Sequence, residues 1–224
     1  MYDNSSIVRK QESVLATNRV LRNTYLLLSL TLLFSAAMAI VSVATNARSP
    51  GIIITLVGIY GLMFLTQALR NSIWGLVSAF AFTGFMGYLL GPILNLYIHN
   101  FSNGSELIAT ALGTTGAVFL GLSAYVLTTR KDFSYLGGFL MAAVIGAVVL
   151  SVLGLFFHAP ILSLAISGLF VLISSGLILF ETSMIIQGGV TNYIMATISL
   201  YVSIYNLFIS LLQIFAAFAG NRNQ

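Results

Sequence analysis

Two long apolar runs near the end of the chain decide the fold: ILSLAISGLFVLISSGLILFETSMII over residues 161–186 and YIMATISLYVSIYNLFISLLQIFAAFA over residues 193–219. Each run exceeds the about 20 mostly apolar residues with which a helix crosses a membrane. Strands of a membrane barrel are instead segments of about ten residues in which apolar and polar side chains alternate. The connection between the runs, Gln187–Asn192, contains two adjacent glycines, which favour a turn. The runs therefore predict two antiparallel membrane helices.

The composition of the whole chain extends this prediction. Of 224 residues, 58% are hydrophobic and only 6% are charged, and the mean hydropathy is +1.01. Soluble domains carry about 25% charged residues, so this chain cannot cover a water-facing surface. The composition excludes a soluble enzyme, a nucleic-acid-binding protein and a disordered chain, and it makes the lipid bilayer a partner. Because the chain has no cysteine, disulfides and cysteine-ligated metal centres are excluded as well.

Seven apolar spans follow one another, joined by connections of ten residues or fewer. We therefore predict an all-α integral membrane protein with seven transmembrane helices in one domain, residues 24–219. A polar N-terminal tail, residues 1–23, precedes this domain, and a short C-terminal tail, residues 220–224, follows it. The spans are Thr24–Thr45, Gly51–Leu69, Ile73–Leu96, Leu107–Thr128, Phe133–Phe156, Ile161–Ile186 and Tyr193–Ala219.

Basic residues indicate the direction of crossing, because they collect in cytoplasmic loops. If the spans alternate, seven of the nine basic residues share the side of the N-terminus, and only Arg48 and Arg222 lie on the other. We therefore predict a cytoplasmic N-terminus and a periplasmic C-terminus. If the last span only re-enters the membrane, the C-terminus returns to the cytoplasm. The seven are Arg9, Lys10, Arg19, Arg22, Arg70, Arg130 and Lys131.

Polar residues form a stripe along the last span and a matching face on the sixth. At 100° per residue, the stripe covers roughly an 80° sector. We expect both faces to turn away from lipid. They serve either hydrogen bonds between the helices or a polar cavity or ion path between them. The stripe contains Asn192, Ser199, Ser203, Asn206, Ser210 and Gln213, and the face on the sixth span contains Ser163, Ser167, Ser174 and Glu181.

Glu181 is the only carboxylate inside an apolar span. It lies about 8 Å from the cytoplasmic end of its helix, and an antiparallel hairpin brings it level with Ser199, with Ser203 one turn deeper. Because an apolar setting disfavours a charged carboxylate, we predict that Glu181 exchanges a proton or binds a cation such as calcium near neutral pH. Ser199, Ser203 and Asn206 complete this candidate site. Alternatively, the carboxylate extends to the membrane surface.

Catalytic sites find little support in the sequence. His99 and His158 both fall in predicted extracytoplasmic loops, where neither can serve as a base for an intramembrane serine nucleophile. Two histidines without cysteine also do not make a convincing zinc site. We therefore predict no enzyme, no catalytic residues, no metal centre and no resident cofactor.

Small residues and one proline mark the third span. Gly87 and Gly91 have the spacing with which membrane helices approach closely, either within the bundle or between two copies of the chain. Pro92 lacks an N–H donor, so we expect it to bend or break the helix and a neighbouring helix to satisfy the freed carbonyl.

The chain resembles the Bax-inhibitor family, in its bacterial YccA-like branch, through motifs that cover nearly its whole length. The matching segments are Arg22–Tyr25, Phe80–Phe85 with Leu90–Leu94, Ser123–Tyr125, Thr128–Asp132, Leu136–Gly138, Ser174–Gly176, Leu179–Thr182, Leu200-Tyr201 and Asn206–Phe208. This resemblance implies six helices around a central seventh, and an inner-membrane protein that modulates the FtsH protease, itself associated with HflK and HflC.

We hypothesise that the polar tail Met1–Asn23, with its four basic residues, is the segment through which such a protease binds the chain. A protease that extracts membrane proteins would grip this tail, and a tightly packed bundle would resist extraction. The tail has few apolar residues, and we expect it to be disordered.

Other members of the family are pH-sensitive calcium leaks that use two acids, one on the sixth and one on the seventh span. By resemblance, Glu181 matches the first acid, and Ser203 stands at the position of the second. One acid beside a hydroxyl lacks the coupled titration of two carboxylates and offers less charge to a divalent ion. A calcium leak is therefore the alternative prediction for this chain.

Overall fold

The computed structural model describes the backbone of residues 4–154 and 160–220, with side chains described over residues 19–154 and 162–220. Over these residues the chain is helical and contains no strand. Its seven long helices are each apolar enough to cross a membrane, which confirms the predicted class. They are α1 (Asn4–Ala44), α2 (Ile52–Leu69), α3 (Ile73–Asn100), α4 (Gly104–Thr129), α5 (Gly137–Gly154), α6 (Pro160–Ile186) and α7 (Tyr193–Gly220), and a short 3-10 helix, η1 (Ser134–Leu136), precedes α5.

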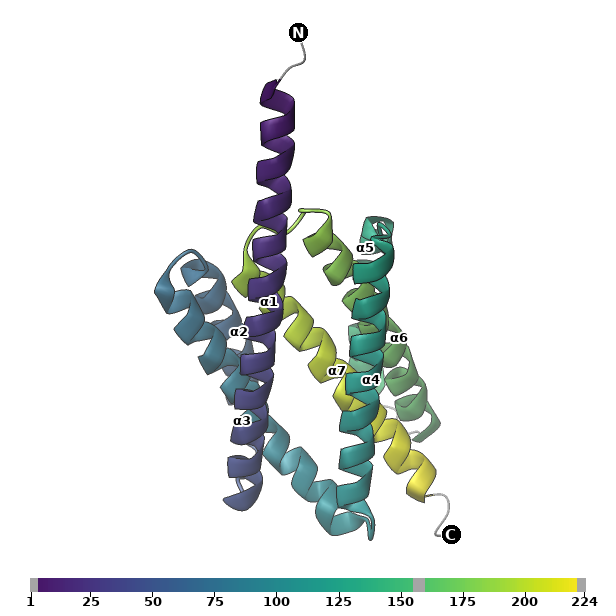
Figure 1. The fold of residues 1–224 in the computed structure, drawn as a ribbon. Helices are drawn as coiled ribbons and strands as arrows, with labels where there is room; N and C mark the ends of the chain where they lie inside the picture. The colour runs from purple at the N-terminus through teal and green to yellow at the C-terminus, as the bar shows by residue number, and fades with distance from the viewer. Residues whose placement is uncertain (1–3, 155–159, 221–224) are drawn as a thin grey trace.

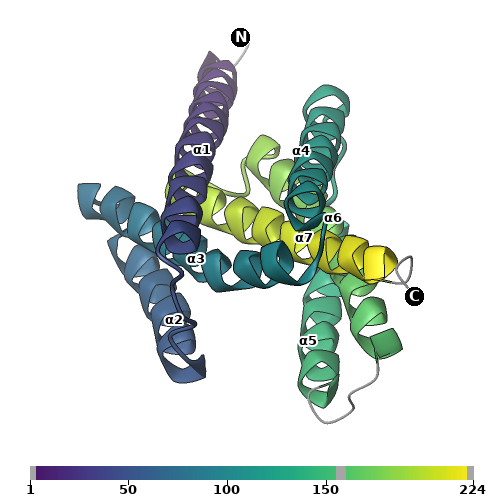
Figure 2. The same ribbon diagram turned by 90° about the horizontal axis from the view of Figure 1, so that it is seen from below.

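The last helix, α7, runs through the middle of the bundle (Figures 1 and 2). It packs against α1, α2, α3, α4 and α6, whereas α5 packs on α6 and η1 and reaches α7 only through α6. Leu200, Leu207 and Leu212 of α7 are fully buried, as befits a helix with neighbours on most sides. The predicted central seventh helix is thus confirmed, with α5 as an outer member of the ring.

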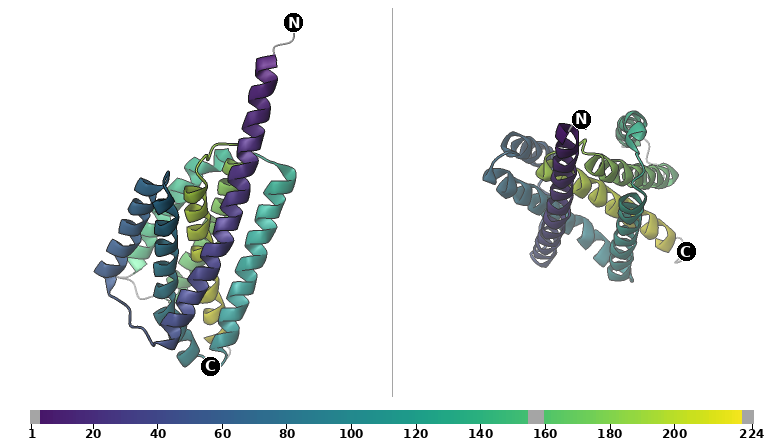
Figure 3. Two further views of the ribbon diagram at one scale, coloured as in Figure 1. Left: turned by 60° about the vertical axis from the view of Figure 1, so that its left-hand side comes forward. Right: turned by 45° about the horizontal axis from the view of Figure 1, so that its top comes forward.

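The N-terminal end of α1 and the C-terminal end of α7 lie at opposite ends of the molecule (Figures 1 and 3). The 28 residues of α7 span about 42 Å at 1.5 Å per residue, more than the about 30 Å of bilayer hydrocarbon. The last helix is therefore long enough to cross the hydrocarbon layer, as the predicted full crossing requires. The cytoplasmic placement of the α1 end stays a prediction.

The first helix begins much earlier than expected. It starts at Asn4 and continues without interruption to Ala44, so the prediction of a disordered tail is wrong for residues 4–23. The tail contains no glycine or proline, the two residues that oppose a helix most strongly. Once the membrane span has formed, each further turn only extends an existing helix. This part of α1 projects beyond the other helices (Figure 3).

The connection between α3 and α4 is shorter than the predicted break Tyr97–Glu106, because α3 continues to Asn100 and α4 begins at Gly104. The Phe101 N–H donates to the Tyr97 carbonyl at 3.2 Å, and the two rings stack with centroids 5.8 Å apart. These contacts close the end of α3. His99 consequently lies in the last turn of α3, not in a loop, and His158 lies outside the described residues.

Helices α1 and α3 form the most extensive helix pair of the bundle. A Cβ added at Gly87 would overlap the backbone carbonyl of Ser35, and one at Gly91 would overlap Ser42. Only glycine permits this approach, so the glycine pair serves packing within the bundle. Pro92 does not break α3, which is continuous. Its missing N–H frees the carbonyl of Tyr88, and Ser42 of α1 donates to that carbonyl at 2.7 Å, as predicted.

Candidate functional site

The carboxylate of Glu181 faces the central helix. Ser203 of α7 donates its hydroxyl hydrogen to Glu181 Oε2 at 3.1 Å. Ser203 is 1% exposed, while Glu181 itself is half-buried. The acid therefore lies at the edge of the α6–α7 interface and does not extend freely to the membrane surface.

The register of this contact differs from the predicted one, in which Glu181 was level with Ser199. The Cα–Cβ bonds of a helix tilt towards its N-terminus. In two antiparallel helices, this tilt directs Glu181 deeper into the bundle and directs Ser203 back towards the α6–α7 turn. This tilt brings the two side chains closer together than the predicted levels of their backbones. The length of the α6–α7 connection predicts which backbone positions of the two helices are level, but it does not account for the tilt of the side chains.

The remaining residues of the candidate site lie apart from Glu181. Ser199 is exposed and Asn206 is half-buried, and within the described residues neither donates a hydrogen bond to the carboxylate. Ser203 and Ser210, at one edge of the polar stripe, are buried, whereas Ser199 and Gln213, towards the other edge, are exposed. Ser199 and Gln213 thus lie at the accessible border of the stripe, although Gln213 still bonds to α6. The periodicity of the sequence predicts which sector of α7 is polar, but it does not predict which part of that sector is covered by the neighbouring helices.

The matching face of α6 does contact α7, as expected. Ser167, which is 2% exposed, donates to Oε1 of Gln213 at 2.7 Å. Together with the Glu181–Ser203 contact, this bond ties the two helices at points 14 residues apart on α6. Both bonds are between side chains, and both partners of each were on the predicted polar faces.

The chemistry of the site suits a proton better than a metal ion. Calcium takes six to eight oxygen ligands, but Glu181 and Ser203 supply one carboxylate and one hydroxyl. Among the residues that the structure describes, no group of three or more His, Asp or Glu side chains could hold a metal. A single carboxylate with a hydroxyl partner can instead take up or release one proton, and the hydroxyl can reverse its hydrogen bond to suit either form.

The loop after α4 is fastened to the end of α6 near Glu181, which sequence reasoning missed. Ser183 accepts from the Phe133 N–H at 2.9 Å and donates to the Lys131 carbonyl at 3.2 Å. Gln187 donates to the Arg130 carbonyl at 3.2 Å. The predicted polar face of α6 includes Glu181 but not Ser183 or Gln187. Both of these residues bond to backbone atoms, which a pattern of side chains does not reveal.

The charged side chains of this loop interact locally. The ammonium of Lys131 lies 5.6 Å from the centroid of the Tyr125 ring, and its hydrogen bond to Tyr125 raises the pKa of Lys131. The backbone amide and the hydroxyl of Ser134 lower the pKa of the Asp132 carboxyl. These side chains remain charged at neutral pH.

A second polar cluster joins three helices, and the polar patterns of the single helices do not predict it. Tyr201 of α7, 1% exposed, shares a hydrogen bond of 2.6 Å with the hydroxyl of Ser35 on α1. It also donates to the carbonyl of Thr83 on α3 at 3.2 Å. Tyr201 lies outside the predicted polar stripe. Its hydroxyl reaches both partners only because α1, α3 and α7 are rotated so that Ser35 and the Thr83 carbonyl face it. It holds α7 against the α1–α3 pair.

Comparison with known proteins gives the family. Residues 17–220 match the family model described as "Inhibitor of apoptosis-promoting Bax1". That match covers far more than half of the chain and includes all of α2 to α7. The chain belongs to this family.

Relatives within the Bax inhibitor family are similar over almost their full length. The chain is 60% identical over 202 residues to "Modulator of FtsH protease YccA" of Escherichia coli strain K12, covering 90% of this chain and 91% of the relative. It is equally similar to "Inner membrane protein YccA" of Escherichia coli O6:H1. An uncharacterized protein of Pseudomonas aeruginosa is 57% identical over 223 residues, which cover 98% of this chain and 97% of the relative.

The N-terminal part of this Bax inhibitor family chain is the other candidate site, as a partner-binding segment. Arg19 and Arg22 are exposed on α1, while the side chains of Arg9 and Lys10 lie outside the described residues. Val20 and Leu21 pack against the core of the bundle. The helix therefore begins to pack on the bundle at Val20, while Arg19 and Arg22 stay accessible to a partner.

Proposed function

We propose that the chain is an inner-membrane protein that binds and modulates the FtsH protease. The observation that carries this proposal is the 60% identity, over nine-tenths of both chains, to the modulator of FtsH protease YccA of Escherichia coli. The second relative, named an inner membrane protein, supports the location. The seven apolar helices and the long, well-packed α7 suit a partner that meets the protease within the membrane.

In this proposal the projecting part of α1, residues 4–18, is the segment that the protease engages. It is the part of the described chain that extends beyond the other helices (Figure 3), and its sequence is polar and basic. A pull on this segment acts directly on the α1–α3 pair, which the glycine contacts hold closely. The protease is thereby occupied without readily extracting the chain.

Co-purification from membranes tests the binding step. A tagged, proteolytically inactive FtsH is expressed with the full chain and with a variant lacking residues 2–18, in cells with and without HflK and HflC. The full chain should co-purify with FtsH, and the shortened variant should do so at least about tenfold less. A seven-helix membrane protein of unrelated family serves as the control. Equal recovery of the chain and this control with FtsH would refute binding, and retention only in cells with HflK and HflC would make those proteins the direct partners.

A second candidate function is a proton or cation leak at Glu181. The hydrogen bond between Ser203 and this carboxylate, within the apolar bundle, favours it over a purely structural polar face. Glu181 lies more than one turn inside α6, whereas Glu106 lies in the first turn of α4. An acid at this depth in an apolar helix gains or loses a charge when it titrates.

Flux measurements in proteoliposomes test this second function. Proton and calcium flux are measured from pH 6 to pH 8 with the unaltered chain, with Glu181→Gln and with Ser199→Ala as a matched polar change away from the contact. We expect Glu181→Gln to abolish the pH dependence and Ser199→Ala to preserve it. Flux that is the same in all three preparations would remove this function and leave the FtsH proposal untouched.

A further inference from the structure

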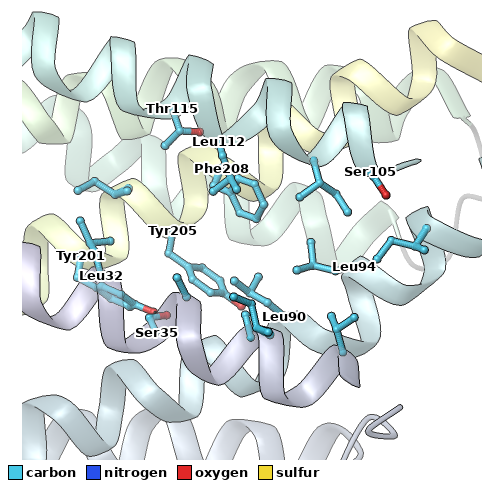
Figure 4. Close-up of a pocket in the computed structure, with 17 residues that line it drawn as sticks. Leu32, Ser35, Leu90, Leu94, Ser105, Leu112, Thr115, Tyr201, Tyr205 and Phe208 are labelled. Atoms are coloured by element: carbon cyan, nitrogen blue, oxygen red, sulfur yellow. Dashed lines mark hydrogen bonds between the residues drawn. The ribbon is translucent and has the colours of Figure 1, made fainter. Parts of the chain in front are cut away.

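A groove separate from the Glu181 contact lies between α1, α3, α4 and α7, with a volume of about 400 Å³ (Figure 4). Its floor is α7, and its walls are α1 and α4. Among the described residues α1 and α4 do not pack on each other, although each packs on α7. The groove is therefore open sideways, towards the acyl chains of the bilayer. Its lining includes Ala36, Ala39, Leu94, Ile108, Leu112 and Phe208.

The length of the groove corresponds to one leaflet. On α1 the lining runs from Leu32 to Val43, and on α4 from Ser105 to Thr115. At 1.5 Å per residue these stretches are about 16 Å and 15 Å long, close to half of the about 30 Å hydrocarbon thickness. The lining ends at Ser105, in the first turn of α4. The start of α4 lies at the end of the molecule opposite the projecting part of α1 (Figure 1).

The polar atoms of the lining are mostly occupied, which argues against an ion or water path. Ser35 and Tyr201 are paired with each other at 2.6 Å, and Thr115 donates to the Ala111 carbonyl at 2.7 Å. Of the other lining residues, Ser105 and Tyr205 each carry a hydroxyl, and the rest are hydrocarbon. Such a surface gains contact energy from an apolar occupant and has little to offer an ion.

The volume suits a single hydrocarbon chain. At about 30 Å³ for a group the size of a water molecule or methylene, about 400 Å³ corresponds to about 13 such groups in a row. An acyl chain of one leaflet supplies a row of this kind, and a helix of a second copy is the competing occupant that the test must distinguish.

A polar pocket lies on the adjacent side of the same end of α3. Leu94 and Ile98 line the groove, whereas Asn95 and His99, one residue further along the helix, line this pocket together with Arg48. The exposed guanidinium of Arg48 suits a phosphate, to which arginine donates two parallel hydrogen bonds. Hydrocarbon and phosphate contacts thus lie at the depths where a phospholipid carries these two parts.

We propose that the groove is a binding site for one acyl chain of a membrane phospholipid from the leaflet at this end, with Arg48 holding its phosphate. Such a lipid fills the space between α1 and α4 and fixes their separation. It is a bound component of the fold, distinct from the exchanging lipid around α2 and α5.

Native mass spectrometry of the intact protein in mild detergent tests the acyl-chain part, with added long-chain phosphatidylglycerol as the probe. Ala36→Phe fills the groove, and Ala37→Phe places the same ring on the neighbouring exposed position, which does not line it. We expect Ala36→Phe to weaken lipid binding about tenfold and Ala37→Phe to leave it unchanged. On the other wall, Leu112→Trp should weaken binding and Leu120→Trp, on an exposed position outside the groove, should not.

The proposed contact between Arg48 and the lipid phosphate is tested by comparing two lipids. Arg48→Gln should weaken phosphatidylglycerol binding but not the binding of a long-chain diacylglycerol, which has no phosphate, and Arg70→Gln at the other end should change neither. Equal binding to the groove-filling variants and their matched controls would overturn the proposal. A shift from dimer to monomer in Ala36→Phe, without loss of lipid, would also overturn it by making a second copy the occupant. Arg48→Gln that weakens both lipids equally, or neither, would remove the phosphate contact.

Discussion

The two parts of α1 form one continuous helix but meet different surroundings. Residues 4–18 project beyond the bundle and are polar and basic in sequence. The part after Thr24 buries Leu28, Thr31 and Ser42 and packs along α3. One rigid element therefore joins an accessible segment to the most extensive interface of the bundle. A force on the first part is resisted mainly by the second.

The largest effect on this comparison should come from breaking the close approach of α1 and α3. Gly87→Ala places a Cβ on the backbone carbonyl of Ser35, and we expect it to lower the free energy of unfolding by about 1–3 kcal/mol. Gly113→Ala is the matched control, since a Cβ there meets no heavy atom within 4 Å. Thermal unfolding in detergent micelles measures both. Equal melting temperatures of the two variants would show that α1 is not held by this contact.

The next effect comes from the bond that compensates for Pro92. Ser42→Ala leaves the Tyr88 carbonyl without a donor, and we expect it to lower the free energy of unfolding by about 1–2 kcal/mol. In a Pro92→Ala background the helix supplies its own N–H to Tyr88, so the same Ser42→Ala change should cost clearly less. A double-mutant cycle by thermal unfolding gives this coupling. Additive losses would mean that Ser42 does not act through the freed carbonyl.

A smaller effect is expected at the α6–α7 interface. Ser203→Ala removes the hydroxyl that donates to Glu181, and membrane hydrogen bonds of this kind average about 0.6 kcal/mol. Ser199→Ala is the matched control and should leave stability unchanged. The difference in stability between the two variants tests the register of α6 and α7, because the sequence alone predicts that Glu181 is level with Ser199. A greater loss with Ser199→Ala than with Ser203→Ala would contradict the observed contact.

The smallest effect should be that of Asp132, far from the α1–α3 pair. Its carboxylate accepts from the Ser134 N–H at 2.8 Å, which lowers the pKa of Asp132 below its ordinary value of 3.8. A lowered pKa stabilises the fold above that ordinary value and loses its effect as the pH falls through the folded pKa. Asp132→Asn should therefore lower the melting temperature slightly at pH 7 and not at all at the lowest pH at which the protein remains folded. A difference that grows on acidification would reverse the sign of this contribution.

The sequence predicts some of these features well and misses others for physical reasons. Hydropathy placed the last span at Tyr193–Ala219, and α7 is Tyr193–Gly220, because the bilayer sets the length of a span. Proline chemistry predicted that another helix must satisfy the carbonyl that Pro92 frees. The helical start of α1 was missed, because low apolar content measures how little a segment can bury and not whether it extends an existing helix.

The candidate site was predicted only in part. Periodicity found the faces of α6 and α7 that meet, including Glu181 and Ser203. It could not separate Ser203 from Ser199, since side-chain tilt and the edge of the interface decide between them. The bonds of Tyr201 to α1 and α3 depend on the rotation of three helices at once, which no single-helix pattern contains.

The central claim is that this chain occupies FtsH through the projecting part of α1. The most direct measurement is the rate at which FtsH in proteoliposomes degrades a second membrane substrate, alone, with the full chain and with the variant lacking residues 2–18. That variant keeps Val20 and Leu21, which pack on the core, so the bundle stays intact. We predict that the full chain slows degradation and that the shortened chain does not. Degradation that is equally slow with both would contradict the role of α1, and degradation unaffected by the full chain would contradict the proposed function itself.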